Sequence, residues 1–81
     1  MEKDIKNVET VNVPNSSMIM EVGYDNESKV LFVRFKGNAV YAYSNVPPEM
    51  FGKIMEVLHN QESVGKFFTK NIRGKFPTVK L

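Results

Sequence analysis

The chain has 81 residues, enough for one domain with a modest hydrophobic core. Its 42% hydrophobic and 25% charged content is typical of a globular protein, and no apolar run is long enough to cross a bilayer, which excludes a helical membrane protein. The absence of cysteine excludes disulfides and thiolate metal sites, and the charged start at residues 1–4, with no hydrophobic segment after it, predicts a cytoplasmic protein.

Basic residues gather towards the end of the chain, although the net charge is only +2. Acidic residues outnumber basic ones in residues 1–28, and none follows Glu62. The basic residues after that point are Lys66, Lys70, Arg73, Lys75 and Lys80. Such a cluster favours an anionic partner, but a solvated face that keeps the protein soluble gives the same pattern.

Three β-strands are expected in the first half of the chain. Residues 1–15 are polar with scattered valines, and we interpret them as a flexible tail or a short edge strand. Alternating or β-branched runs then predict strands over residues 18–24, 30–35 and 39–43. Asp25 begins a turn, and Lys36-Gly37-Asn38 forms a tight turn in which Gly37 or Asn38 takes a positive φ. Such short turns predict a three-stranded antiparallel meander.

Two helices are expected in the second half. Pro47-Pro48 opens the first, because proline is accepted in a first helical turn. Its apolar stripe is Phe51, Ile54, Met55 and Leu58. Ser63 is the expected N-cap of the second helix, and Gly74 fits its end. The apolar face of that helix is Val64, Phe67, Phe68 and Ile72. The predicted fold is α+β, with two C-terminal helices packed on the meander.

Several short motifs occur in an order that resembles the KTSC domain, a small domain named for the C-terminus of some lysyl-tRNA synthetases. They are Ser16-Ser17, Gly23-Tyr24-Asp25, Leu31-x-Val33-x-Phe35, Gly37, Tyr41-x-Tyr43, Val46-Pro47, Ser63-x-Gly65, Phe67-Phe68 and Ile72-Arg73-Gly74. The resemblance covers about residues 16–76, which defines a KTSC-like domain over residues 16–81. The family also occurs as single-domain bacterial and phage proteins, and its synthetase context suggests RNA binding.

The chain departs from this family at one position. Relatives carry asparagine after the paired aromatic residues, where this chain has Thr69. A ligand contact made by that amide in relatives would therefore be missing here.

Aromatic residues on the third strand are the first candidate binding site. Tyr41 and Tyr43 lie two residues apart, so both rings share one face of the strand. They could stack on bases or pack under the helices as core residues. Arg34, on the neighbouring strand, could lie cross-strand from one tyrosine and contact a base or a phosphate, or form an ordinary surface pair.

Cations on the second helix are the second candidate. Lys66, Lys70 and Arg73 are spaced i, i+4 and i+7, which predicts that they point the same way, and Lys75 follows them. They suit phosphate contacts, to which backbone N–H groups near Ser63 and Gly65 could add.

Catalysis and metal binding have weak support in the sequence. His59 is the only histidine, and Asp25, Glu21 and Glu27 lie in or just before a turn, where acidic residues are common. We therefore expect no enzymatic activity, no catalytic residues, no metal and no cofactor.

The sequence favours a binding module for an anionic ligand, foremost RNA and otherwise DNA or a nucleotide. Its predicted site residues are Arg34, Tyr41, Tyr43, Lys66, Lys70, Arg73 and Lys75. One alternative is a phage-type accessory protein in the host cytoplasm that sequesters a nucleotide signal or inhibits a host protein, as a homo-oligomer. Another is a protein-interaction module in which the apolar tail residues Ile5, Val8, Val11 and Val13 pair with another chain.

Overall fold

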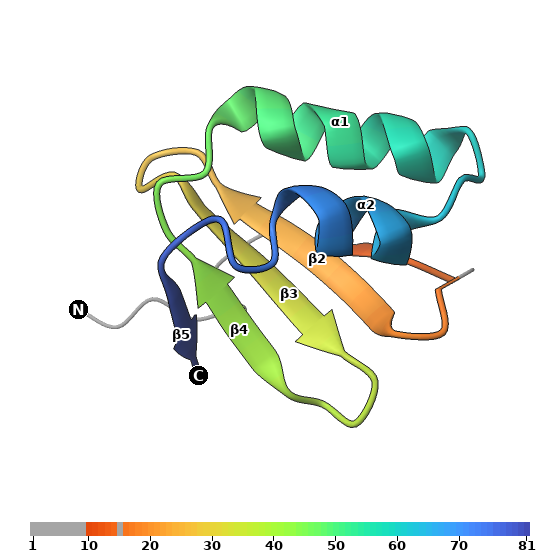
Figure 1. The fold of residues 1–81 in the computed structure, drawn as a ribbon, viewed down its shortest axis with the longest axis horizontal. Helices are drawn as coiled ribbons and strands as arrows, with labels where there is room; N and C mark the ends of the chain where they lie inside the picture. Colours follow the sequence, from red (N-terminus) through yellow and green to blue (C-terminus); the bar gives the residue numbers. More distant parts are fainter. Residues whose placement is uncertain (1–9, 15) are drawn as a thin grey trace.

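The fold is an α+β arrangement of one sheet and two helices (Figure 1). The computed structural model describes residues 10–14 and 16–81. The elements are β1 (Thr10–Asn12), β2 (Ile19–Asp25), β3 (Val30–Phe35), β4 (Val40–Tyr43), α1 (Pro48–His59), α2 (Val64–Asn71) and β5 (Thr78–Lys80). All five strands form a single antiparallel sheet in the order β1-β2-β3-β4-β5. The predicted meander corresponds to β2, β3 and β4. The prediction of a sheet with only three strands is wrong, because the sheet has five.

The two additional strands lie at the edges of the sheet. β1 comes from the segment interpreted as a tail or a short edge strand, and it pairs with β2. Val13, just after β1, is only 2% exposed, and Val11 packs against the same core. The expectation that these two valines are free to pair with another chain is therefore wrong. Ile5 and Val8 lie outside the described residues.

The turns of the meander have the predicted chemistry. Gly37 and Asn38 both take a positive φ, of 94° and 73°. The backbone N–H of Phe35 donates to the carbonyl oxygen of Ala39 at 2.8 Å and closes this turn. The carboxylate of Asp25 accepts from the backbone N–H of Glu27 at 3.0 Å, which holds the preceding turn.

Two glycines should respond to alanine in opposite directions. Gly37 has the positive φ that a side chain disfavours, so Gly37→Ala should lower the free energy of unfolding by about 1–2 kcal/mol. Gly52 lies inside α1, where an added Cβ meets nothing within 4 Å, so Gly52→Ala should raise it by about 0.5–1 kcal/mol. Urea unfolding of both variants and the parent measures the free energy of unfolding. Changes of the same sign in the two variants would contradict the prediction.

Both helices begin as the sequence predicts. Pro47 is the N-cap of α1 and Pro48 its first residue. The hydroxyl oxygen of Ser63 accepts from the backbone N–H of Lys66 at 3.1 Å and caps α2. α2 ends at Asn71, and Gly74 takes a φ of 75° in the turn that follows. No helix in the described part of the chain is long and apolar enough to span a membrane.

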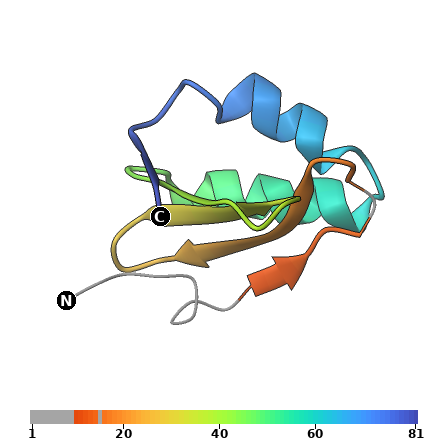
Figure 2. The same ribbon diagram turned by 90° about the horizontal axis from the view of Figure 1, so that it is seen from below.

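The strand register decides which side chains meet the helices. Tyr41 pairs with Val33 and Tyr43 with Leu31, so both tyrosines share the sheet face that packs against the helices. The edge-on view in Figure 2 shows α2 lying over that face. Buried residues from strands, loops and helices form the core between them: Val13, Ile19, Val22, Leu31, Val33, Tyr43, Val46, Ile54, Val64, Phe68 and Ile72.

Candidate ligand-binding site

One cavity on the described surface is lined by four aromatic rings among its nine residues. It has a volume of about 480 Å³ and lies between the β3–β4 hairpin, β5 and the end of α2. We call it the aromatic cavity, and its lining residues are Met18, Phe35, Ala39, Tyr41, Tyr43, Phe68, Arg73, Gly74 and Thr78. Its size is within the usual range for small-molecule sites.

Its rings support one another edge to face. The Phe35 ring lies 5.5 Å from Tyr41 and 5.5 Å from Phe68, and the Phe68 ring lies 5.4 Å from Tyr43. Tyr43 is only 5% exposed, whereas Tyr41 is half-buried. Tyr43 is therefore a core residue whose edge reaches the cavity, and Tyr41 is the tyrosine with accessible ring surface.

Arg73 supplies the positive charge of the aromatic cavity. Burial raises the pKa of the Tyr43 hydroxyl, the nearby Tyr41 adds to this rise, and the positive charge of Arg73 opposes it. The Tyr43 hydroxyl is therefore neutral at physiological pH, and it lies close enough to Arg73 to interact with its charge. Arg73 itself forms no ion pair with another described residue.

The second cavity is polar. It has a volume of about 500 Å³, and we call it the polar cavity. Its lining residues are Ser16, Ser17, Met18, Ser63, Gly65, Lys66, Thr69 and Lys70. The Ser16 hydroxyl oxygen accepts from the backbone N–H groups of Met18 and Ile19 at 3.1 Å and 2.9 Å, which fixes the loop that enters β2. The Thr69 hydroxyl donates to the carbonyl oxygen of Gly65 at 2.9 Å, so at this departure from the family pattern the hydroxyl is bonded within α2.

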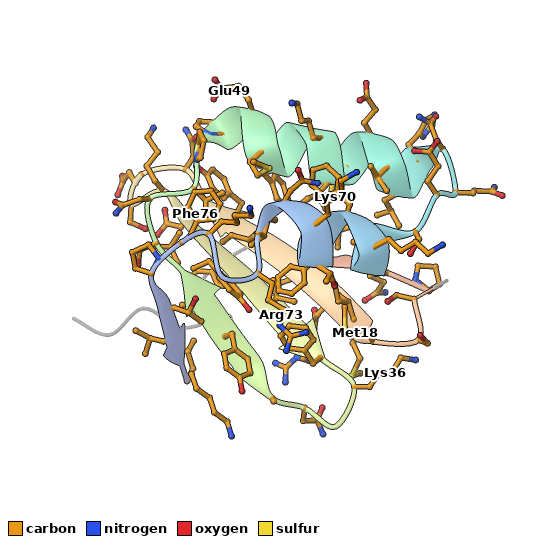
Figure 3. All side chains as sticks on the ribbon, in the orientation of Figure 1. Met18, Lys36, Glu49, Lys70, Arg73 and Phe76 are labelled. Carbon is orange, nitrogen blue, oxygen red and sulfur yellow. The ribbon has the colours of Figure 1, made fainter. Side chains whose placement is uncertain are left out.

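The structure separates the cations that were expected to point the same way. Lys66 and Lys70 line the polar cavity, whereas Arg73 lines the aromatic cavity. In Figure 3, Arg73 lies over the strands. The expectation of one shared face is wrong because α2 ends at Asn71, before the seventh position of the assumed helical spacing. Lys75 is exposed and lines neither cavity.

Arg34 does not lie beside the tyrosines. It pairs with Val40 across the β3–β4 ladder, so its side chain lies on the sheet face opposite Tyr41 and Tyr43. Its Nε donates to the Glu21 carboxylate at 2.7 Å, and both side chains are about one quarter exposed, at 25% and 22%. The expected cross-strand contact with a tyrosine is therefore wrong, and the alternative of an ordinary surface pair describes Arg34.

The remaining candidates are dispersed. Glu21 is paired with Arg34, and Asp25 holds a turn. His59 lies at the end of α1 and lines neither cavity. Within residues 10–14 and 16–81, no group of three or more histidine, cysteine or acidic residues is placed to hold a metal ion.

Most of the lining residues were not among those predicted for the site. Met18 lines both cavities, Ser17 lines the polar cavity, and Thr78 lines the aromatic cavity. Thr78 belongs to β5, a three-residue strand that the sequence pattern does not reveal. The adjacent hydroxyls of Ser16 and Ser17 before a strand were a usable signal, but they pointed only to the family resemblance.

Comparison with known proteins gives consistent matches. The family model described as the KTSC domain matches residues 15–76. A protein of Tsukamurella paurometabola is 38% identical over 66 residues, which cover 82% of this chain and 92% of that protein. A lysine–tRNA ligase of Nostoc punctiforme is 36% identical over 63 residues, which cover 78% of this chain but only 10% of the ligase.

A solved structure has the same architecture. The crystal structure of a KTSC domain protein from Yersinia pestis superposes with a TM-score of 0.80 at 31% sequence identity. The match covers 91% of this chain and 97% of that one. Since the family model also spans most of the folded residues, this chain belongs to the KTSC domain family.

Proposed function

We propose that this domain is a non-enzymatic binding module for single-stranded RNA. The observation that carries the proposal is the aromatic cavity, in which the half-buried ring of Tyr41 lies near an Arg73 that has no acidic partner among the described residues. Single-stranded RNA can interact with both groups, because its unpaired bases stack on aromatic rings such as Tyr41 and its phosphates attract an arginine such as Arg73. DNA single strands share this chemistry and are the natural comparison ligand.

The charges around the two cavities support an anionic ligand. Arg73, Lys66 and Lys70 line them, and no acidic residue in the described part of the chain does. Neither Lys66 nor Lys70 is ion-paired with another described residue. An anion entering this region would therefore meet several cations and no carboxylate from the described residues.

The relatives support RNA in particular. The lysine–tRNA ligase of Nostoc punctiforme, by its name a protein that acts on tRNA, contains a segment similar to most of this chain. This segment makes up a tenth of that ligase, so what it contributes there is itself part of the proposal.

We assign the domain no reaction. Proton transfer in a binding site usually needs a histidine or a carboxylate within hydrogen-bond reach of the ligand. No histidine or carboxylate of the described residues lines either cavity. The lining hydroxyls therefore lack the partner that usually activates a nucleophile, which supports binding.

The test is an RNA titration of the parent protein and two single-charge variants. Arg73→Gln should weaken binding to a single-stranded oligoribonucleotide and lower the salt slope by about 0.7, the value for one neutralised phosphate of a single strand. Lys53→Gln is the matched control, because Lys53 is an exposed cation on α1 that lines neither cavity. Titration at two salt concentrations measures both the affinity for RNA and its salt slope. Absence of RNA binding by the parent, or equal behaviour of the two variants, would overturn the proposal.

A further inference from the structure

We infer that the two cavities form one site for a phosphorylated nucleotide unit, with the base in the aromatic cavity and its phosphate in the polar cavity. This inference rests on the proposed function and specifies its recognition unit. The proposed function requires only stacking and an arginine. The inference adds that Lys66 and Lys70 serve the phosphate of the same nucleotide whose base contacts Tyr41.

The cavities adjoin at Met18, which lines both of them. Phe68 and Thr69 are consecutive residues of α2, and one lines each cavity. Figure 3 shows Met18 and Arg73 on neighbouring parts of the surface over the sheet. The side chain of Met18 is therefore the common wall, and a ligand that extends beyond the aromatic cavity at this point meets the polar one.

Gly65 keeps this junction free of a further side chain. An ideal Cβ at position 65 would lie 3.4 Å from the Met18 Cε atom and 3.5 Å from the Ser16 hydroxyl oxygen. Any larger side chain there would extend into the space lined by Met18 and Ser16. Gly65, which has no side chain, thus lies beside Met18, where the two cavities adjoin.

The polar cavity has unused donors for phosphate oxygens. The hydroxyl oxygens of Ser16 and Ser63 both accept from backbone N–H groups, and neither hydroxyl donates to another described residue. Each therefore keeps its own hydrogen available. Lys66 and Lys70 add two ammonium groups without acidic partners among the described residues, and phosphate oxygens accept such charge-assisted hydrogen bonds well.

The aromatic cavity has the opposite character. Phe35, Tyr41, Tyr43 and Phe68 line it, and their rings suit a flat ring and offer few donors to an anion. A nucleoside alone would leave Lys66 and Lys70 without a partner, and inorganic phosphate alone would leave the rings without one. A nucleotide, which joins a flat base to a phosphate, satisfies both halves.

The experiment compares whole and partial ligands on the intact protein. The probes are the four ribonucleoside 5′-monophosphates, the four nucleosides and inorganic phosphate, titrated by calorimetry. At least one monophosphate should bind about tenfold or more tightly than its nucleoside, since hydrogen bonds to charged groups are the stronger class. The double variant Lys66→Gln with Lys70→Gln should lose most of this preference for the monophosphate over its nucleoside.

The control removes two charges elsewhere. Lys53→Gln with Lys75→Gln has the same net charge as the test variant but alters residues that line neither cavity. It should keep the preference for the monophosphate. Thermal melts of both double variants establish that each is folded, which is expected because all four lysines are exposed.

The outcomes separate this inference from the proposed function. Equal affinity for monophosphate and nucleoside, no binding of either, or equal effects of the two double variants would overturn the inference. RNA binding that still depends on Arg73 would then leave the proposed function standing. Failure of RNA and of all the small probes would overturn both.

Discussion

Phe68→Ala should lower the free energy of unfolding by about 3–5 kcal/mol, since it removes a large buried ring from between α2 and the sheet. Phe68 is 3% exposed, and its ring contacts Phe35 and Tyr43 edge to face at 5.5 Å and 5.4 Å. The strand residues below are held in a paired ladder, so they have little freedom to collapse into the space left behind. Urea or thermal unfolding monitored by circular dichroism measures the loss.

Phe67→Ala is the matched control for this change. Phe67 is the preceding residue of α2 and only half-buried, so its removal leaves a smaller cavity and should cost clearly less. A Phe68→Ala protein with the unfolding midpoint of the parent, or one less affected than Phe67→Ala, would contradict the placement of Phe68 in the core.

Tyr41→Ala and Tyr43→Ala should separate ligand binding from stability. Tyr41 has accessible ring surface in the aromatic cavity, so its removal should weaken single-stranded RNA binding by about 1–3 kcal/mol, the value of one base stacked on an aromatic ring. Tyr43 is 5% exposed and packs on Phe68, so Tyr43→Ala should instead destabilise the fold by about 3 kcal/mol or more.

Thermal melts and RNA titrations on both variants decide this prediction. The titration of Tyr43→Ala is done at a temperature where that variant is still folded, so that unfolding is not mistaken for weaker binding to RNA. The stacking role of Tyr41 fails if its alanine variant keeps parental affinity. It also fails if both variants unfold without a selective decrease in binding by either.

The local chemistry of turns and helix starts was predictable from short motifs. Gly37 and Asn38 both take the positive φ expected of that turn, and Ser63 caps α2 as expected. Each of these features depends on a few adjacent residues, so a single sequence contains the necessary information. A short edge strand was expected only as an alternative to a tail for residues 1–15, where β1 lies. β5 was missed because its three residues are too few to show an alternating pattern.

The candidate site was less predictable because it depends on register and on a helix end. Tyr41 and Arg34 lie on neighbouring strands, but whether they share a face depends on the pairing of Val33 with Tyr41, which the turn between them decides. A shift of one residue in the β3–β4 register would have placed Arg34 and Tyr41 on the same face of the sheet. Similarly, the direction of Arg73 follows from the end of α2 at Asn71, which helical spacing alone does not predict.

The shortness of the edge strand β5 also limits self-association at that edge of the sheet. Edge strands present unpaired backbone groups on which other chains can build fibrils. Here the edge strand β5 has three residues, whereas β2 and β3, which pair on both sides, have seven and six. Another chain that added to the edge at β5 would find only a short ladder, with Lys80 as a charged side chain at its end. The same brevity that hides β5 from sequence patterns thus protects this edge of the sheet against pairing with further chains.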